Sequence, residues 1–369
     1  MYGSDKVLLS LVSKLKDEYA PVVLLPRHGP LFDAMKALSL NVRVIPLVVV
    51  GRRTFGFAGL LRLPLDTWRS VRAISRVVRE KQIDVVYSNT LAVLSGAVWA
   101  WLHSIRHVWH VHEIIERPVM ARKGFAWLLR LLATKVICNS SATRQALLND
   151  QPALAKKTSV VWNGLQRETP VDKEQVQVWR SQLGLEADEV LVVLVGRVNR
   201  WKGQGLLVRA ADILWRDGVR NCRFLIVGSA PEGQPYFHEK LLKDIAASNQ
   251  KERIIVWPYR DDVWAVWDMC DIAVVPSTES EPFGLVAVEA MAAGKSVIAA
   301  AHGGLVEIVR HEETGLLFEP GNADALADAI TRLAGDEALR KRFGENGLQR
   351  FNDHFTLDLY VAGIRKAIL

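Results

Sequence analysis

Short apolar segments alternate with longer amphipathic segments along the whole chain. In the first half, the apolar segments that predict strands are Val22–Leu25, Val42–Ile45, Val85–Tyr87, Val108–Val111, Val136–Cys138 and Ser159–Val161. Between them, Thr67–Lys81 and Ser140–Leu148 have the spacing of amphipathic helices. Strands that alternate with helices in this way predict a parallel sheet with helices on both faces.

The second half repeats the same alternation. Its predicted strands are Val190–Val195, Phe224–Val227, Ile254–Val256, Ile272–Val275, Val297–Ala299 and Leu316–Phe318. Its predicted helices are Gln204–Trp215, His238–Ser248, Val263–Met269, Leu285–Ala293 and Ala323–Leu333. The 369 residues are enough for two domains. The pattern therefore predicts an α/β protein made of two doubly wound, Rossmann-like domains.

A turn-rich segment separates the two halves. Asn163–Pro170 opens with an Asn-Gly dipeptide and ends in proline, which is typical of an interdomain linker. We expect an N-terminal domain over residues 1–165 and a second domain over 166–350, joined by a hinge beside a cleft. In sheets of this kind, ligands bind outside the carboxyl ends of the strands.

Cysteine content and hydropathy restrict the cellular compartment. Cys138, Cys222 and Cys270 lie in or beside apolar stretches and form no C-x-x-C pair, which favours buried thiols in a reducing compartment. The first residues form no apolar signal-peptide core. No uncharged apolar run reaches the roughly 18 residues of a membrane span. We expect a cytoplasmic protein.

The net charge of +7 is divided unevenly along the chain. Residues 1–165 contain 23 Lys and Arg but 10 Asp and Glu, whereas the remainder is net acidic. Arginines accompany aromatic and leucine side chains in Gly51–Arg79 and Val119–Ala133. Such segments suit an anionic membrane surface, although packing aromatics with solvated arginines would give the same pattern. Nucleic acid is a poorer partner, because no recognition motif accompanies the charge.

Two loops in the second half carry candidate binding residues. Val192–Val195 runs into Gly196, and Arg197 and Lys202 follow, so two cations lie past the end of a strand, where they suit a phosphate or are simply solvated. After Ile272–Val275 comes the loop with Glu281, and Gly284 precedes a helix that carries Glu289. A helix start favours an anion, and a carboxylate on an apolar helix needs partners such as ribose hydroxyls. An ordinary surface loop is the alternative.

Taken together, these motifs resemble the donor-site signature of family-4 retaining glycosyltransferases of the GT-B fold. The residues that carry the resemblance are Gly196-Arg197-x4-Lys202-Gly203, Glu281-Pro282-Phe283-Gly284 followed by Glu289 in a Glu-x7-Glu spacing, His302–Val309, and Thr314–Gly321. The resemblance extends over essentially the whole chain and is densest from residue 190 to 335.

The resemblance implies a role for each matching residue. Arg197, Lys202 and the N–H groups of Gly284 and Leu285 would bind the donor diphosphate, Glu289 the ribose, and Glu281 the transferred sugar. The residues implied in donor binding are Gly3, Gly196, Arg197, Lys202, Gly228, Pro258, Tyr259, Arg260, Glu281, Pro282, Phe283, Gly284, Leu285 and Glu289. We expect no metal and no cofactor besides the nucleotide sugar, since two cations and a helix start would offset the leaving charge and no Asp-x-Asp motif occurs.

In the first half, the resemblance points to a histidine near the transferred sugar. His112 matches best, and it joins Glu281, Arg197 and Lys202 as an implied catalytic residue. His110 lies on the same face of a continued strand and is the second choice. A metal-binding His-x-His pair and a hydrogen-bonded packing histidine are the alternatives.

The chain departs from the family at its beginning. The family starts with a central strand and a glycine-containing loop, whereas this sequence begins within that loop, before a helix predicted over Val7–Leu15. We expect the first strand to be missing, which puts the role of Gly3 in doubt. Residues 351–369 resemble the tail helix that returns to the N-terminal domain.

These observations lead to one functional expectation and two alternatives. We expect a retaining glycosyltransferase that moves a sugar from a UDP or GDP sugar to a hydroxyl of a lipid-linked or cell-surface glycan precursor. It would work in the cytoplasm, peripherally on the inner face of the membrane, and without nucleic acid. A catalytically silent nucleotide-sugar-binding partner is one alternative. The other is a sugar-nucleotide epimerase or a phosphorylase of the same fold.

Overall fold

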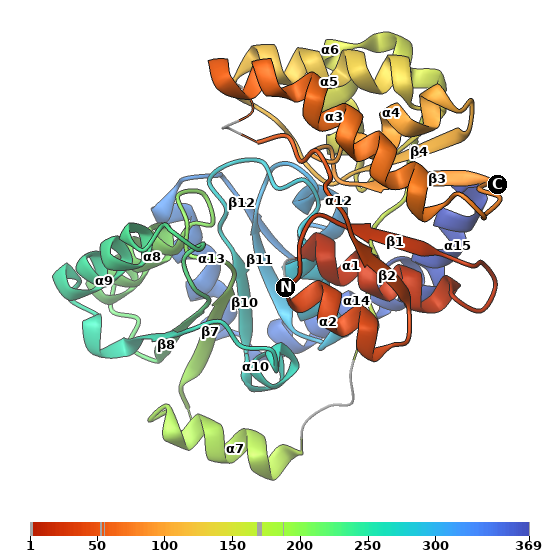
Figure 1. The fold of residues 1–369 in the computed structure, drawn as a ribbon. Helices are drawn as coiled ribbons and strands as arrows, with labels where there is room; N and C mark the ends of the chain where they lie inside the picture. Colours follow the sequence, from red (N-terminus) through yellow and green to blue (C-terminus); the bar gives the residue numbers. More distant parts are fainter. Residues whose placement is uncertain (1–2, 52–53, 55, 168–171, 187, 369) are drawn as a thin grey trace. The chain divides into compact units, whose positions relative to one another are not determined.

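A computed structural model describes residues 3–51, 54, 56–167, 172–186 and 188–368. Residues 168–170 of the expected linker, and Arg52, Arg53 and Phe55 of the basic segment, lie outside these ranges. The chain forms two compact units (Figure 1). Unit 1 contains residues 1–165 and 357–369, and unit 2 contains residues 166–356. Both are α/β units with parallel sheets, so the predicted fold class is confirmed.

Unit 2 has a six-stranded parallel sheet with the order β12-β11-β10-β7-β8-β9. Its strands are β7 (Val190–Val195), β8 (Cys222–Val227), β9 (Ile254–Trp257), β10 (Ile272–Val275), β11 (Ser296–Ala300) and β12 (Gly315–Phe318). Its helices are α7 (Lys173–Gln182), α8 (Gln204–Arg216), α9 (Tyr236–Ala247), α10 (Val263–Met269), α11 (Leu285–Ala292), α12 (Leu305–Ile308), α13 (Ala323–Gly335) and α14 (Glu337–His354).

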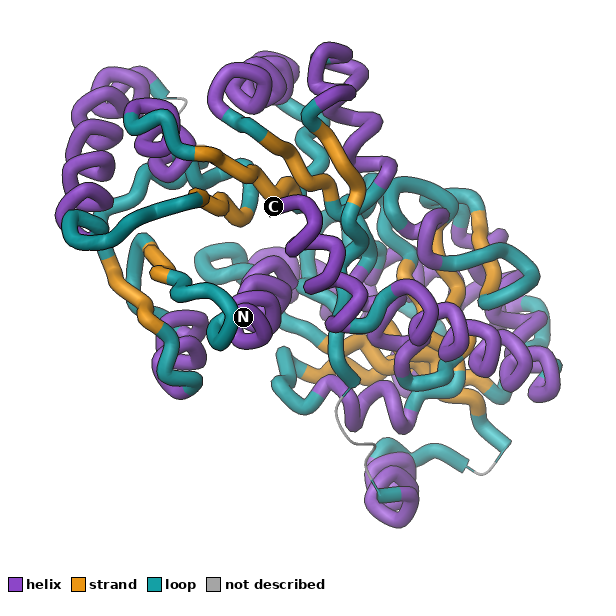
Figure 2. Tube along the Cα trace, turned by 90° about the vertical axis from the view of Figure 1, so that its right-hand side faces the viewer, coloured by secondary structure: helices purple, strands orange, loops and turns teal. Residues whose placement is uncertain are grey.

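Helices cover both faces of this sheet. Helix α8 packs with α9 and α13 on one face, while α11 packs with α10 and α14 on the other (Figure 1). Figure 2 shows the strands, in orange, enclosed between purple helices. The central strands are therefore buried on both faces, which explains why β7 and β10 are uninterrupted apolar runs.

Unit 1 has two separate parallel sheets, β1-β2 and β3-β4-β5-β6. Their strands are β1 (Val22–Leu25), β2 (Asn41–Val44), β3 (Val85–Asn89), β4 (Arg106–Val111), β5 (Lys135–Cys138) and β6 (Thr158–Val160). The helices are α1 (Gly3–Leu15), α2 (Pro30–Ala37), α3 (Phe57–Val77), α4 (Ser95–Leu102), α5 (Val119–Leu132), α6 (Ser141–Asp150) and α15 (Leu357–Ile368). In the described ranges, β1 and β3 each keep one edge without a strand partner.

The beginning of unit 1 differs from the expectation in one respect. Gly3 is the first residue of α1, so the described residues before Val7 are helical and do not form a loop. Asp5 lies in the first turn of this helix, where a carboxylate interacts favourably with the helix dipole.

Helix α3 begins ten residues before the predicted Thr67. It contains Pro64, which is the eighth residue of the helix and is exposed. Because proline has no N–H, the hydrogen bond from this position to the carbonyl four residues earlier cannot form. Although α3 is 21 residues long, no helix in the described part of the chain is both long and apolar enough to span a membrane.

The end of the chain returns to unit 1. Helix α14 continues to His354, so the return begins at Leu357 and not at residue 351. The N–H of Leu357 donates to the carbonyl of Leu165 at 2.9 Å. Helix α15 packs on α1, and the Lys14 ammonium lies 3.1 Å from the Asp358 carboxylate. Gly363 lies so close to Val161 that an added Cβ would be 2.7 Å from its side chain.

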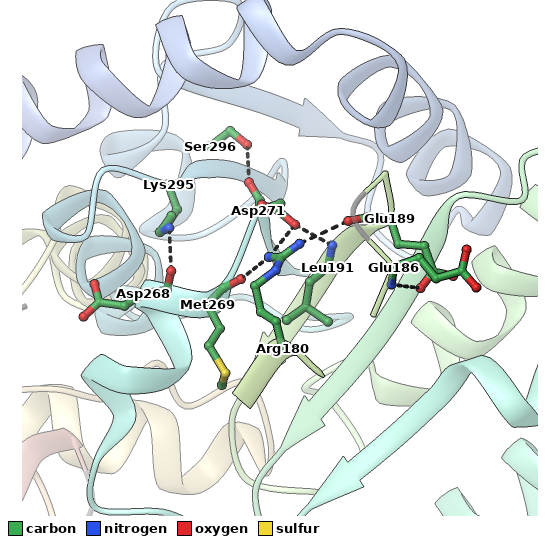
Figure 3. Close-up of polar contacts among 9 residues, drawn as sticks. All are labelled: Arg180, Glu186, Glu189, Leu191, Asp268, Met269, Asp271, Lys295 and Ser296. Carbon is green, nitrogen blue, oxygen red and sulfur yellow. Dashed lines mark hydrogen bonds and ion pairs between the residues drawn. The ribbon is translucent and has the colours of Figure 1, made fainter. Parts of the chain in front are cut away.

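An ionic cluster fastens α7 to the amino ends of the central strands of unit 2 (Figure 3). The guanidinium of Arg180 donates to the Met269 carbonyl at 2.7 Å, to the Asp271 carboxylate at 2.9 Å and to the Glu189 carbonyl at 3.1 Å. The same carboxylate oxygen of Asp271 accepts the N–H of Leu191 at 2.7 Å. Because α7 buries no residue of its own, this cluster is a main attachment of α7 to the sheet.

Replacing Arg180 should therefore destabilise unit 2. Arg180→Met leaves the partly buried Asp271 carboxylate without its cation and removes a donor from two carbonyls, and we expect a loss of about 2–3 kcal/mol in the free energy of unfolding. Urea unfolding of the full chain would measure it. Arg216→Met is the control: it breaks an exposed ion pair with Asp217, and its effect should stay below about 0.5 kcal/mol. Equal effects of the two changes would contradict this account.

Candidate functional site

The centre of the unit 2 sheet is a point where the chain changes direction. Strands β8 and β9 follow β7 to one side, whereas β11 and β12 follow β10 to the other. The loops after the adjacent strands β7 and β10 therefore diverge at the carboxyl edge, which is where open α/β sheets bind ligands. Lys202 lies in the first of these loops and Glu281 in the second.

Glycines allow the two loops to approach each other closely. Gly203, with φ of +81°, precedes α8, and an added Cβ would lie 1.9 Å from the carbonyl oxygen of Pro276. Gly284, with φ of +113°, precedes α11 in the same left-handed region. The N–H of Thr278 also donates to the Trp201 carbonyl at 2.7 Å. As a result, two helices begin beside each other at this edge, and their first N–H groups can bind an anion.

Lys202 and Glu281 form an ion pair between these helix starts. The Lys202 ammonium lies 2.5 Å from Oε1 of Glu281, and the two side chains are only 16% and 5% exposed. The hydroxyl of Ser277 donates to the same oxygen at 2.7 Å. Nε2 of His302 lies 2.8 Å from the Ser277 carbonyl oxygen. The pair is thus held by residues from three separate loops.

A third loop lies against Glu281 and Phe283. The N–H of Gly304 donates to the Glu281 carbonyl at 2.7 Å. An added Cβ on Gly303, whose φ is +58°, would lie 2.3 Å from that carbonyl oxygen. Phe283 is buried and contacts Phe355 edge to face. This packing fixes the backbone that carries Glu281 and leads into α11.

Glu289 lies one turn into α11 and is buried. The indole N–H of Trp267 in α10 donates to Oε2 of Glu289 at 3.3 Å. The pKa of Tyr259 is raised to about 12, first by burial, then by its hydrogen bond to Asp261, and also by the charges of Asp261 and Glu289. The negative charge of Glu289 therefore influences Tyr259 in the loop after β9.

That loop carries the residues expected near a nucleotide base. The N–H of Tyr259 donates to the hydroxyl of Ser229 at 2.9 Å. Arg260 binds Asp262 with two hydrogen bonds, at 2.8 and 2.6 Å, and lies over the ring of Trp257. Pro258 is exposed.

Gly228 and Gly196 bring this loop next to the loop after β7. An added Cβ on Gly228 would lie 1.9 Å from the Gly196 carbonyl oxygen. Arg197 follows Gly196 with an exposed side chain. Unit 2 thus brings together the cations, glycines and carboxylates of the expected site, in an arrangement that suits an anion bound next to hydroxyl groups.

In unit 1, His112 lies one residue past the end of β4. Its Nε2 is 2.9 Å from Oδ1 of Asn89, and the amide nitrogen of Asn89 donates to the Ser4 carbonyl at 3.4 Å. This places Nε2–H on His112 as the donor to Asn89. Glu113 accepts the N–H groups of Leu91 and His112 at 3.1 and 3.0 Å. His112 is thus held at a strand end, as expected.

His110, the second choice, is fully buried inside β4. Its Nδ1 lies 2.5 Å from the hydroxyl of Tyr87, so it fits the packing alternative better than a ligand-binding role. Burial lowers the pKa of His110, and lowers that of His107 and His112 to about 4. No group of three or more His, Cys, Asp or Glu suited to a metal ion occurs among the described residues.

These histidines should make unit 1 sensitive to acid. The unfolded chain binds protons below a pKa of about 6.5, whereas the folded unit does so only near 4, so stability should fall as the pH drops from about 6.5 to 4. Three imidazoles give a limiting slope of roughly 4 kcal/mol per pH unit. Glu113, whose pKa burial raises, acts in the opposite direction.

Hydrogen exchange of the β4 amides, corrected for its intrinsic pH dependence, would measure this loss in unit 1. His107→Gln removes one titrating group and should make the decline shallower. His311→Gln, on the exposed surface of unit 2, should leave it unchanged. An unaltered decline in the His107 variant would show that other groups cause it.

Sequence reasoning missed several residues of the unit 2 site. Ser277 and His302 support Glu281, Trp267 supports Glu289, and Oδ1 of Asn199 accepts the N–H groups of Trp201 and Lys202 at 3.1 and 3.0 Å. Asn199 has a recognisable signal, because asparagine often binds its own backbone two residues on. His302 belongs to a motif that was recognised, but its contact with Ser277 was not predicted. Ser277 lies four residues from Glu281, a spacing too common to be a signal, and Trp267 binds a carboxylate on another helix.

Comparisons with known proteins identify the family of the chain. Residues 2–169 match the family Glycosyltransferase Family 4, and residues 175–350 match Glycosyl transferases group 1. A D-inositol 3-phosphate glycosyltransferase from Corynebacterium aurimucosum is 31% identical over 286 residues, which cover 72% of this chain and 67% of the relative. One from Corynebacterium glutamicum is 34% identical over 216 residues, which cover 57% of this chain and 51% of that relative. The chain thus spans about half to two thirds of the length of these two proteins.

Solved structures give the same result. The crystal structure of Anabaena HepE in complex with UDP and glucose is 26% identical, with a TM-score of 0.85 over 100% of this chain and 96% of that chain. Since both halves match their family and the fold matches as well, this chain belongs to family 4 of the glycosyltransferases, whose fold is GT-B.

Proposed function

We propose that this protein transfers a sugar from a nucleoside-diphosphate sugar to a hydroxyl group, with retention of the anomeric configuration. The observation that carries the proposal is the Lys202–Glu281 pair between the starts of α8 and α11. It places a cation suited to a diphosphate beside a carboxylate suited to sugar hydroxyls. The structural relative HepE was solved with UDP-glucose, which supports a UDP sugar as the donor.

The leaving diphosphate is the group that this site would stabilise. Charge builds on it as the bond to the sugar breaks, and fixed donors near that charge lower the barrier. We assign this work to Lys202, Arg197 and the N–H groups of Gly284 and Leu285, so that no divalent metal is required. Glu289, oriented by Trp267, would bind the ribose, and Tyr259 would lie near the base.

Retention is proposed to occur by front-face displacement, in which the leaving phosphate assists the incoming hydroxyl. His112 would contact the transferred sugar. Burial lowers the pKa of His112 to about 4, so the imidazole is neutral at pH 7. It would therefore act as a hydrogen-bonding group and not as a cation.

For the acceptor, we propose a lipid-linked or cell-surface glycan precursor at the inner face of the membrane. The excess of basic residues in the first 165 positions supports an anionic acceptor. The Corynebacterium relatives also act, according to their name, on a phosphorylated polyol.

Variants of Lys202 and of Glu281 should differ in their effects on UDP binding and on turnover. Lys202→Met should weaken binding of UDP by about 10- to 100-fold, because a charge-assisted contact to phosphate is lost. Glu281→Gln should abolish most turnover of UDP-glucose, yet leave UDP binding equal or tighter, since Lys202 no longer has a competing carboxylate. Calorimetry with UDP and a hydrolysis assay would measure both.

Glu279→Gln is the matched control for these variants. Glu279 belongs to the same loop but pairs with Arg200, an exposed side chain. It should alter neither UDP binding nor turnover. Normal turnover in both the Lys202 and the Glu281 variants would refute the site assignment.

The stereochemical proposal can be tested without knowing the acceptor. With water in place of the acceptor, UDP-α-glucose should release α-glucose first, which proton NMR detects before mutarotation. The reaction should proceed with a metal chelator present. Release of β-glucose would refute retention, and UDP binding without any hydrolysis or transfer would favour a silent sugar-nucleotide-binding protein.

A further inference from the structure

Helix α3 exposes large apolar side chains along one side. Leu61, Leu65 and Trp68 are spaced by four and three residues, so they lie on the same face of the helix. They are 67%, 47% and 53% exposed. Single exposed leucines are ordinary on protein surfaces, but a contiguous stripe indicates an interaction surface.

Helix α5 exposes a second stripe of the same kind. Met120, Trp127 and Leu131 are spaced by seven and four residues, which again puts them on one face. They are 87%, 55% and 49% exposed. The opposite sides of both helices face the interior, where Leu63 of α3 and Leu128 of α5 pack against the same core cluster around Phe125 and Leu129.

Positive charge borders both stripes. Helix α3 contains four arginines and a single acidic residue, Asp66, which lies 3.6 Å from Arg69. Helix α5 contains Arg122, Lys123 and Arg130 and no acidic residue, although Arg122 pairs with Asp150 of α6 at 2.7 Å. Within the α3 stripe itself, the guanidinium of Arg72 lies 4.6 Å from the ring centroid of Trp68. These two apolar stripes with their basic borders are called the basic apolar face below.

We infer that the basic apolar face binds the surface of an anionic lipid bilayer. Leucine, methionine and tryptophan side chains gain free energy on entering the boundary between headgroups and acyl chains, and arginines beside them contact lipid phosphates. The aliphatic side chains argue against nucleic acid, since a phosphate backbone offers them nothing to bury against. The basic side chains of the two helices, apart from Arg69 and Arg122 with their partners Asp66 and Asp150, match the negative charge of such a bilayer.

This inference rests on the proposed function in one respect: a lipid-linked acceptor would explain why the enzyme binds a membrane. A helix that lies in the plane of the membrane would let the enzyme bind reversibly, since two such stripes bury far less apolar surface than a membrane-spanning helix. The basic apolar face contains none of the residues assigned to donor binding or catalysis.

Vesicle flotation tests the inference directly. The full chain should float with vesicles of phosphatidylcholine and phosphatidylglycerol, float poorly with phosphatidylcholine alone, and dissociate at high salt. The triple variant L61S/L65S/W68S should lower the partition coefficient at least about tenfold. Replacing Arg62 and Arg72 with glutamine should lower it by about fivefold for each charge.

The control carries the same kind of change on unit 2. Tyr236→Ser and Leu242→Ser remove exposed apolar side chains from α9 and should leave flotation unchanged. Every variant should hydrolyse UDP-glucose like the unaltered chain, so a failure of the donor-site proposal is scored separately. No flotation, equal flotation of the α3 and α9 variants, or salt-sensitive binding to a DNA fragment in place of vesicles would each overturn the inference.

Discussion

Close backbone approach at the carboxyl edge of the unit 2 sheet is the constraint on which the site depends. Three glycines, Gly203, Gly228 and Gly303, lie so near neighbouring carbonyl oxygens that a Cβ would be within 2.3 Å of them. Without that approach, the loop with Lys202 could not reach the loop with Glu281, and Gly304 could not bind the Glu281 carbonyl. The ion pair between Lys202 and Glu281 is therefore a consequence of main-chain packing.

The two edges of the same sheet serve different purposes. At the amino ends of the strands, Arg180 and Asp271 bind each other and nearby backbone groups. At the carboxyl ends, Lys202 and Glu281 are paired, but they adjoin two helix starts whose N–H groups favour an anion. The cluster around Arg180 and Asp271 stabilises the folded sheet. Lys202 and Glu281 lie beside further N–H donors, so they can exchange partners when a ligand enters.

Much of the fold could be predicted from the sequence because burial on both faces makes parallel strands continuous apolar runs. Strands β7 and β10 have the predicted bounds for this reason. The start of α3 could not be predicted, since proline is unfavourable inside a helix and Pro64 is the eighth residue of α3. In the site, the charged residues and glycines could be predicted from their order along the sequence. Ser277 and Trp267 could not, because a serine four residues before a carboxylate is not a distinctive pattern and the Trp267–Glu289 bond joins two separate helices.

The return of α15 to unit 1 has a consequence for the order in which the protein is assembled during translation. Unit 1 comprises residues 1–165 and 357–369, so its last helix leaves the ribosome only after all of unit 2 has been made. Until then, the surface of α1 that binds α15, and the backbone around Leu165 and Val161, lack their partner. Unit 2 can thus finish folding first, whereas unit 1, the more basic unit, completes its fold only after residues 357–369 have been synthesised.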